Sequence, residues 1–290
     1  MNNPMLRIFF LSLLFCLYSI VTLAQSPEEK TPEGIWHTKI GDVDFYCLQD
    51  APSEFNPNVL ITDDKELLQQ LMPSGKAPGS YNVFVVRKGS ETILIDTGKG
   101  GKMLEHLQTL GIEPGDVKTV LLTHSHGDHV GGLVKDGKKV FPNAGIQLNA
   151  RELDFWKSAR NKELCEQVLK LYGEPEFLIP NEKTSVMIPE IVAIDLVGHT
   201  PGQIGFLLFS GDEKLIVVAD LLHCGAVQFQ RPDISCRYDN DPKQSAEIRR
   251  KTMKRAAEGK WLFVGSHLPF PSAGIVEVDG EAFRFTPVSP

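Results

Sequence analysis

The sequence predicts an α/β fold in which one domain is built from two similar halves. Segments with strand-like alternation and segments with helical periodicity succeed each other twice, which is typical of one α/β domain. Hydrophobic residues make up 42% of the 290 residues, enough for a sizeable core. The chain has no fixed-period repeat and no low-complexity stretch, which argues against repeat and fibrous architectures. We expect this domain to span residues 25–290.

The first half combines short strands with three helical stretches. A hairpin is predicted over residues 35–48, because hydrophobic residues alternate on both sides of Gly41 and Asp42. Helical periodicity predicts helices over 65–71, 102–110 and most of 150–172. Further strands are predicted at 83–86, 92–96, 117–122 and 146–148. The rest of the segment 51–80 is rich in proline and glycine, which favours a flap or an entrance segment.

The second half brings strands and a helix together again. Hydrophobic runs predict three strands, at 191–197, 204–209 and 214–219. An amphipathic helix is predicted over 242–259, where it ends at a glycine. Three closing strands are predicted at 261–264, 275–278 and 282–285.

The N-terminus has the pattern of a signal peptide. One positive charge within residues 1–7 precedes an almost wholly apolar run at 8–23, and Thr22 and Ala24 are small residues where signal peptidase reads the chain. An uncleaved anchor is the alternative, but the apolar run is slightly shorter than a usual membrane-spanning segment. We therefore predict a cleaved, bacterial-type signal peptide over 1–24. It implies export to the periplasm or the medium, with no stable membrane insertion after cleavage.

The charge distribution argues against a nucleic-acid partner, and the cysteine spacing argues against two kinds of cysteine-based site. The formal net charge is −7, and the basic residues are scattered rather than gathered in the patch that binds nucleic acid. The cysteines after the predicted signal peptide form no CxxC pair, which argues against a zinc knuckle or a thioredoxin-like motif. They are Cys47, Cys165, Cys224 and Cys236. Export permits disulfides, buried free thiols are the default for a large domain, and the sequence leaves the choice open.

The strongest functional signal follows the strand predicted at 117–122. The run Thr123-His124-Ser125-His126-Gly127-Asp128-His129 places three imidazoles and one carboxylate within six residues. His124 and His126 face the same way on an extended backbone, and Gly127 allows a sharp turn that brings in Asp128 and His129 from another side. Neutral imidazole and carboxylate suit zinc and its first-row neighbours. Four such ligands would crowd one ion that also binds water, which favours two metal ions.

This His-x-His-x-Asp-His run resembles the hallmark of the metallo-β-lactamase fold superfamily, and further motifs follow in the family order. Downstream, the matching residues are His199 in Gly198-His199-Thr200-Pro201-Gly202, Asp220 after a predicted strand, and His267 in Gly265-Ser266-His267. Upstream, Ile95-Asp96-Thr97-Gly98 matches the first family motif. The resemblance spans residues 82–267. It implies a four-layer αβ/βα sandwich of two mixed β-sheets flanked by helices.

The resemblance also implies a role for each of these residues. One metal ion would be held by His124, His126 and His199, and the other by Asp128, His129 and His267. Asp220 would bridge both ions, and Asp96 would orient a ligand imidazole from behind. Two divalent ions are expected, zinc first, with manganese, iron or cobalt as alternatives that the same ligands accept. A hydroxide bridging the ions would attack an acyl carbon or phosphorus, which makes Asp128 and Asp220 catalytic residues.

Within the superfamily, the chain resembles the methyl parathion hydrolase-like branch, which includes organophosphate hydrolases and quorum-quenching lactonases. The segments that carry this resemblance are 82–86, 221–229, 231–233, 239–242 and 267–271. Classical zinc β-lactamases have cysteine in place of Asp220, which argues against that branch. The leading hypothesis is hydrolysis of a small ester-like molecule: a lactone, a carboxylic ester or a phosphotriester. Hydrolysis of a β-lactam amide and a metal-bearing binding protein without turnover remain alternatives.

The surroundings of the metal centre are less sharply predicted. His223 lies three residues after Asp220 and is a candidate catalytic residue that hydrogen-bonds the substrate or leaving group. A position behind a ligand or in the core is the equal alternative. Phe229 and Phe270 are candidates for an apolar substrate wall, although buried aromatic residues more often belong to the core. A homodimer that uses the N-terminal hairpin and the segment 51–80 is a further expectation.

Overall fold

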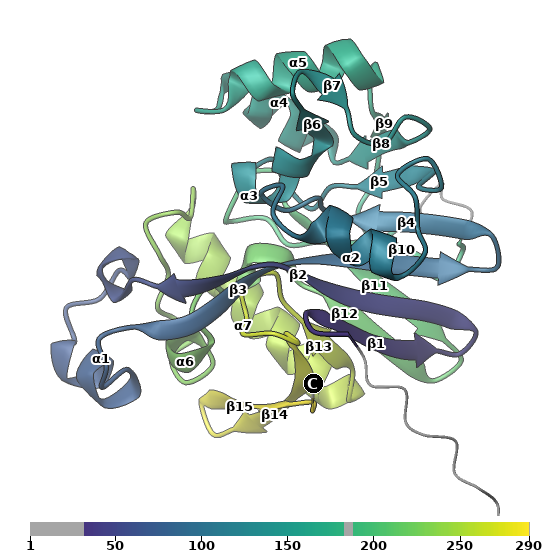
Figure 1. Ribbon diagram of the computed structural model, residues 1–290. Helices are drawn as coiled ribbons and strands as arrows, with labels where there is room; N and C mark the ends of the chain where they lie inside the picture. Colours follow the sequence, from purple (N-terminus) through teal and green to yellow (C-terminus); the bar gives the residue numbers. More distant parts are fainter. Residues whose placement is uncertain (1–31, 183–187, 290) are drawn as a thin grey trace, which may run out of the picture. The chain divides into compact units, whose positions relative to one another are not determined.

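The computed structural model describes residues 32–182 and 188–289, in which two β-sheets pack face to face with helices on their outer sides (Figure 1). Within these residues the first sheet has seven strands, in the order β1-β2-β3-β4-β5-β8-β9. They are β1 (Ile35–Ile40), β2 (Val43–Phe55), β3 (Ala77–Lys88), β4 (Glu91–Ile95), β5 (Thr119–Leu121), β8 (Gly145–Leu148) and β9 (Glu176–Phe177). A separate short ribbon pairs β6 (Val134–Lys135) with β7 (Lys138–Lys139).

The second sheet has six strands within the same described part of the chain, and they follow each other in sequence order. They are β10 (Ile191–Asp195), β11 (Ile204–Ser210), β12 (Glu213–Val217), β13 (Leu262–Val264), β14 (Ala273–Asp279) and β15 (Ala282–Pro287). In the first sheet β1 to β4 pair antiparallel and β4, β5, β8 and β9 pair parallel. In the second sheet only the β12–β13 pair is parallel. Both sheets are therefore mixed, as predicted.

Strand β3 shows how one sheet is buried on both faces. Successive side chains of a strand point to opposite faces, and both kinds of position are apolar here. Phe84 joins the cluster between the sheets, which also contains Phe206 of β11. Val85 joins the cluster on the outer face, which contains side chains of α2 (Met103–Thr109). All three side chains are fully buried.

Helices cover the outer face of each sheet. The first sheet packs against α2 together with α4 (Ala150–Ser158) and α5 (Lys162–Tyr172), whose apolar residues share its outer cluster. The second sheet packs against α7 (Pro242–Gly259), which contributes Met253 and Ala256 to a third cluster. These three clusters separate four layers, so the predicted four-layer αβ/βα sandwich is confirmed.

The segment 51–80, predicted as a flap or an entrance segment around one short helix, begins and ends in strands. Strand β2 continues to Phe55 and β3 begins at Ala77, so the two strands form a long hairpin that carries α1 (Lys65–Leu71) at its tip (Figure 1). Pro52 pairs with Ser80 and Pro78 with Glu54 along this ladder, beyond an irregularity in register between Gln49 and Ala51. Proline is tolerated at such positions where the sheet has no further neighbour.

The remaining helices are short and lie near the strand ends. They are α3 (Gly127–Val130), α6 (Gly225–Gln228) and the 3-10 turns η1 (Pro57–Val59), η2 (Gly131–Leu133) and η3 (Ala219–Leu221). Cys47, Cys165, Cys224 and Cys236 are buried free thiols, so no disulfide joins these four residues. Among the described helices, none combines the length and hydrophobicity needed to cross a membrane. The predicted signal peptide lies outside the described residues and stays a prediction.

Candidate metal centre

The seven predicted ligands follow the carboxyl ends of strands from both sheets. They are His124 and His126 after β5, Asp128 and His129 in α3, His199 between β10 and β11, Asp220 in η3 after β12, and His267 after β13. Ligand sites in open α/β sheets commonly lie beyond the carboxyl ends of strands. Residues that are up to 143 positions apart, such as His124 and His267, are thereby brought to one place.

Two turns at this edge have a strained backbone. Asp96 has φ 62° and Ala219, directly before Asp220, has φ 49°. Residues other than glycine rarely adopt this left-handed region, and they do so mainly where the surrounding structure holds them and function benefits. The backbone N–H of Asp96 donates to the carbonyl of Leu121 (2.9 Å), and that of Ser266 donates to the carbonyl of Ala219 (3.3 Å). The strain therefore lies where the two sheets present their site residues.

One group of side chains contains three imidazoles and Asp220. The ligand atoms of His124, His126, His199 and Asp220 all lie within 4.8 Å of one another. His126 Nδ1 is 3.2 Å from His124 Nε2 and 2.9 Å from His199 Nε2. Three ring nitrogens from two different sheets therefore converge on one point, as the cage around a metal ion requires.

A second group lies beside the first. The ligand atoms of Asp128, His129 and His267 lie within 4.8 Å of one another, and His267 Nε2 is 3.5 Å from Asp128 Oδ2. Asp220 faces both groups. Its Oδ2 atom is 3.4 Å from His199 Nε2 and 3.0 Å from His267 Nε2, while its Oδ1 atom is 3.0 Å from His129 Nε2. The carboxylate thus lies between the two sets of ligands that the sequence predicts.

The imidazoles of the first group are held neutral in the metal-free protein. Burial and the neighbouring His129 place the pKa of His124 well below its usual value. Burial and His199 lower the pKa of His126 to about 4, and burial also lowers the pKa of His199. Only a neutral imidazole has a lone pair for a metal ion, so binding needs no proton to be removed from these rings.

The charge of Asp220 is stabilised by the second group and its neighbours. Burial alone would raise the pKa of Asp220, but His129, His267 and His124 outweigh it and hold the pKa well below the usual range. For His129 burial would lower the pKa, but the carboxylates of Asp220 and Asp96 raise it well above the usual value. Without metal ions, positive charge on imidazoles such as His129 therefore balances the negative charge of Asp220. Divalent cations bound here would take the place of that positive charge.

Orphaned polar atoms provide a direct test of whether the site fits metal ions. His129 Nε2, Asp220 Oδ1 and His223 Nε2 are buried and make no hydrogen bond among the described residues. His129 Nε2 and Asp220 Oδ1 lie only 3.0 Å apart, yet their mutual geometry is not that of a hydrogen bond. Buried polar atoms are normally satisfied, so unpaired nitrogen and oxygen atoms that converge from several elements fit coordination to cations.

The comparison with known families agrees with this geometry. The family model described as the Metallo-beta-lactamase superfamily matches residues 77–267, a span that contains all seven predicted ligands. The chain belongs to the metallo-beta-lactamase superfamily. The resemblance predicted from the sequence motifs is confirmed.

Curated relatives in this superfamily are distant. The chain is 28% identical over 134 residues to "Uncharacterized protein YobT" of Bacillus subtilis, which covers 43% of this chain and 56% of that protein. It is also 28% identical over 212 residues to the hydroxyacylglutathione hydrolase of Vibrio campbellii, which covers 71% of this chain and 69% of that enzyme. The chain thus spans about half to two thirds of the length of these two curated relatives.

Two solved structures are similar over nearly their whole length. One is titled "AidC, a Dizinc Quorum-Quenching Lactonase" in complex with a product, with a TM-score of 0.82, 27% identity and coverage of 88% of this chain and 98% of that chain. The other is "hydrolase AbOPH in beta lactamase superfamily", with a TM-score of 0.81, 27% identity and coverage of 90% and 99%. The predicted similarity to the branch with quorum-quenching lactonases is confirmed, and so is the prediction of a metal-dependent hydrolase at the level of the superfamily.

Asp96 lies behind the predicted ligand His129. Its Oδ2 atom accepts a hydrogen bond from His129 Nδ1 (2.8 Å) and from Thr123 Oγ1 (2.7 Å), and its Oδ1 atom accepts one from the Thr123 N–H (2.8 Å). A carboxylate on Nδ1 leaves Nε2 of the same ring free for a metal ion and fixes the direction of the ring. Asp96 is therefore placed to orient His129.

We expect Asp96→Asn to weaken zinc binding by about 10–100-fold, the usual effect of changing a residue behind a ligand. The amide cannot accept hydrogen bonds at both of its ends, so the His129 ring loses its fixed orientation. Competition between the metal-free protein and a chelating dye would measure this loss. Asp136→Asn is a matched control, because Asp136 is exposed and also has a left-handed backbone (φ 51°). Equal zinc affinity in both variants would contradict the role of Asp96.

Three residues that support the predicted ligands were not assigned a role from the sequence. Asp239 accepts a hydrogen bond from His199 Nδ1 (3.0 Å) and thus acts on His199 as Asp96 acts on His129. Asn82 donates through its side-chain amide to the carbonyls of Ser266 (3.1 Å) and Leu268 (2.9 Å), on either side of His267. Glu152 is a fully buried carboxylate between two ligand loops. The sequence signal that could have singled out Glu152 is its own position, as an acidic residue on the apolar face of a predicted helix.

His223 lies against the metal centre rather than in the general core. Its Nε2 atom is 3.2 Å from Asp220 Oδ2, and its side chain lines the cavity described below. The Cys236 thiol lies 3.5 Å from its other ring nitrogen, Nδ1. In the tautomer in which Nδ1 accepts from this thiol, the ring proton is on Nε2 and faces Asp220.

A cavity of about 780 Å³ opens beside the predicted ligands. Its walls contain four aromatic side chains, which are Phe55, Tyr81, Phe155 and Tyr238. Polar site residues also line it, namely His126, Asp128, His199, Asp220, His223 and His267. An apolar wall with a few convergent polar groups is the usual composition of a small-molecule site.

The expectation that Phe229 and Phe270 form the apolar wall needs correction. Phe229 is only 5% exposed and stacks on Phe285 with ring centroids 4.8 Å apart, in the cluster under α7. Phe270 packs against the cluster between the sheets. Neither belongs to the described lining of the cavity. Both aromatic side chains are used for packing, and the walls come instead from the β2–β3 hairpin, from α4 and from the segment before α7.

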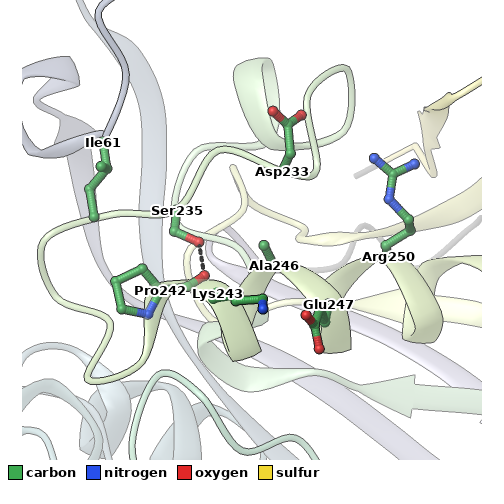
Figure 2. Close-up of a pocket in the computed structure, with 8 residues that line it drawn as sticks. All are labelled: Ile61, Asp233, Ser235, Pro242, Lys243, Ala246, Glu247 and Arg250. Carbon is green, nitrogen blue, oxygen red and sulfur yellow. Dashed lines mark hydrogen bonds between the residues drawn. The ribbon is translucent and has the colours of Figure 1, made fainter.

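A second hollow of about 400 Å³ lies beside the N-terminal half of α7 (Figure 2). Lys243, Glu247 and Arg250 of the helix surround it, and the Ser235 hydroxyl donates to the carbonyl of Pro242 (2.6 Å). Its described lining contains no histidine and no cysteine. The metal-ligand chemistry therefore belongs to the larger cavity.

Proposed function

We propose that this protein is a two-metal hydrolase that acts on a small ester-like substrate, namely a lactone, a carboxylic ester or a phosphotriester. The observation that carries the proposal is the position of Asp220. Its carboxylate faces both groups of ligands, with Oδ2 toward His199 and His267 and Oδ1 toward His129, and a carboxylate shared in this way can hold two cations side by side. We propose zinc as the physiological metal, since imidazole and carboxylate ligands suit it.

The roles of the side chains follow from their positions. The first ion would be held by His124, His126 and His199, the second by Asp128, His129 and His267, and both by Asp220. When bound, two such ions supply Lewis acidity for a substrate oxygen and make water acidic enough to react near neutral pH. Asp96 and Asp239 hold the rings of His129 and His199 in one orientation. His223 directs Nε2 toward the same space, and in the tautomer with its proton on that nitrogen it can donate to the substrate or the leaving oxygen.

The size and the lining of the cavity favour a small uncharged or weakly charged ester as substrate, rather than a polymer. Its volume of about 780 Å³ lies within the range of small-molecule sites, and aromatic rings form much of its wall. The names of similar proteins point the same way. One is a lactonase in complex with its product, and another is a hydroxyacylglutathione hydrolase. These names favour ester-type carbonyl substrates over β-lactam amides.

The proposal is tested by reconstituting metal-free protein with zero to three equivalents of zinc and assaying a panel of substrates. The panel contains an acyl-homoserine lactone, a p-nitrophenyl ester, a phosphotriester and a chromogenic β-lactam. We expect uptake of two equivalents and hydrolysis of at least one of the first three that rises with metal content. Exclusive hydrolysis of the β-lactam would overturn the substrate class. Folded protein that is fully loaded with metal but inactive on the whole panel would point to a binding protein instead.

A further inference from the structure

We infer that Glu152 is a positioning residue that sets the distance between the two loops holding His126 and His199. It would thereby set the affinity for the metal ion that His124, His126 and His199 hold. The inference rests on the proposed two-metal site. Glu152 touches no predicted ligand itself. It lies in the first turn of α4 and acts through the residues next to the ligands.

Each oxygen of the Glu152 carboxylate serves one ligand loop. Oε1 accepts hydrogen bonds from the N–H (2.9 Å) and the hydroxyl (2.6 Å) of Ser125, the residue between His124 and His126. Oε2 accepts hydrogen bonds from the Thr200 hydroxyl (2.6 Å) and the Gly202 N–H (3.1 Å), in the loop that begins at His199. One rigid side chain thus links the loop after β5 of the first sheet to the loop before β11 of the second.

The backbone packing around Glu152 is equally close. A Cβ atom at Gly202 would lie 2.2 Å from the backbone nitrogen of Glu152, so only glycine lets the second loop approach α4 this closely. The two loops also meet directly, where the Ile204 N–H donates to the Thr123 carbonyl (3.0 Å). Thr123 directly precedes the ligand His124, and Ile204 is the first residue of β11. Glu152 thus adds side-chain hydrogen bonds to a contact that the backbone also makes.

The charge of Glu152 supports the same role. Its side chain is fully buried and forms no ion pair with a lysine or arginine among the described residues. A buried carboxylate is costly unless hydrogen bonds or cations stabilise it. Four donors stabilise it directly, and cations held by the neighbouring loops would add to this. A neutral residue at this position would lose both contributions.

Glu152→Gln is the informative variant because the side chain keeps its shape. The glutamine amide has one oxygen and one nitrogen that donates, so whichever way it turns, the backbone N–H of one loop faces another donor, and the hydroxyl of that loop can only accept. We expect one of the two zinc dissociation constants to rise by about 10–100-fold and the other to change little. The d–d absorption bands of the cobalt-loaded variant should also shift, since the ligand geometry at that ion changes. Both measurements are independent of turnover.

Asp154→Asn is the matched control, because it removes the same charge from an exposed position on the same helix. Thr200→Val and Ser125→Ala remove one hydroxyl donor from each loop without altering Glu152, and Thr200→Ser retains that donor. We expect Thr200→Val and Ser125→Ala each to weaken the same binding step, and Thr200→Ser to restore it. These variants keep the test open if Glu152→Gln does not fold.

The outcomes separate this inference from the proposed function. Wild-type protein that takes up no metal would overturn both. Wild-type protein with two zinc sites, together with unchanged affinities and cobalt spectra in Glu152→Gln, would overturn the role of Glu152 alone. A lower melting temperature without a change in either affinity would also overturn it, because the residue would then be only structural. A selective loss at one ion, absent from Asp154→Asn, supports the inference.

Discussion

Asp220→Asn should remove the second metal ion and almost all hydrolytic activity. The carboxylate is the group that faces both ligand sets, with Oδ1 toward His129 and Oδ2 toward His199 and His267. Asparagine keeps the shape but has a single acceptor, so it cannot hold two cations. We expect metal content to fall from two equivalents to one or fewer. Turnover should fall by more than about 100-fold, the upper end of the effect of residues that act only from behind a ligand.

Metal analysis after gel filtration and initial rates on the reactive substrate of the panel would measure both effects together. Asp233→Asn is the control, because Asp233 is a half-exposed carboxylate that pairs with Arg231 (2.7 Å) and lies away from the ligands. It should retain two equivalents and wild-type rates. If Asp220→Asn also retained both, the two ligand groups would not share this carboxylate, and the two-metal proposal would have to be abandoned.

Features that depend on neighbours in sequence could be predicted well. The helix predicted over 242–259 coincides with α7, because Asp241 caps it by accepting from the Gln244 N–H (3.0 Å) and Pro242 fits its first turn. The run from His124 to His129 concentrates ligand-type side chains so strongly that a candidate metal site is predicted from spacing alone, and the structure places their ligand atoms in two neighbouring groups. The hairpin turning at Gly41 and Asp42 is likewise a local signal, and the structure pairs Ile40 with Val43 there.

Features that depend on contacts between distant segments could not be predicted from the residues alone. Glu152 looks like an ordinary surface acid in sequence, and Asp239 stands in a family-like segment without an assigned role, yet the fold buries them against Ser125 and His199. The roles of Phe229 and Phe270 were ambiguous because apolar side chains suit both a core and a pocket. The hairpin of β2 and β3 was hidden because Pro52 and Pro78 weaken the local strand signal, while pairing between the strands determines the structure.

The largest effect on stability is expected at Arg249, a fully buried residue of α7. Its guanidinium donates to the carbonyls of Leu221 (2.6 Å), Pro232 (2.9 Å) and Ile234 (3.1 Å). It also lies 3.7 Å from Asp239 Oδ2. Arg249→Met should lower the free energy of unfolding by about 3–5 kcal/mol, since it leaves three buried carbonyls without their donor and removes the guanidinium charge beside the buried Asp239 carboxylate. Methionine has nearly the same helix propensity as arginine, so the helix itself is not the cause.

Urea unfolding of the metal-free variant would measure this loss, and Arg250→Met is its control. Arg250 is the next residue of the same helix, but its side chain is 42% exposed and pairs with the fully exposed side chain of Glu281. Such surface pairs contribute about 0–1 kcal/mol, so the control should unfold almost like the wild type. Because Asp239 also holds His199, Arg249→Met should weaken zinc binding as well as stability. A loss below about 1 kcal/mol in Arg249→Met would mean that water or rearranged donors satisfy Asp239 and the three carbonyls without the guanidinium.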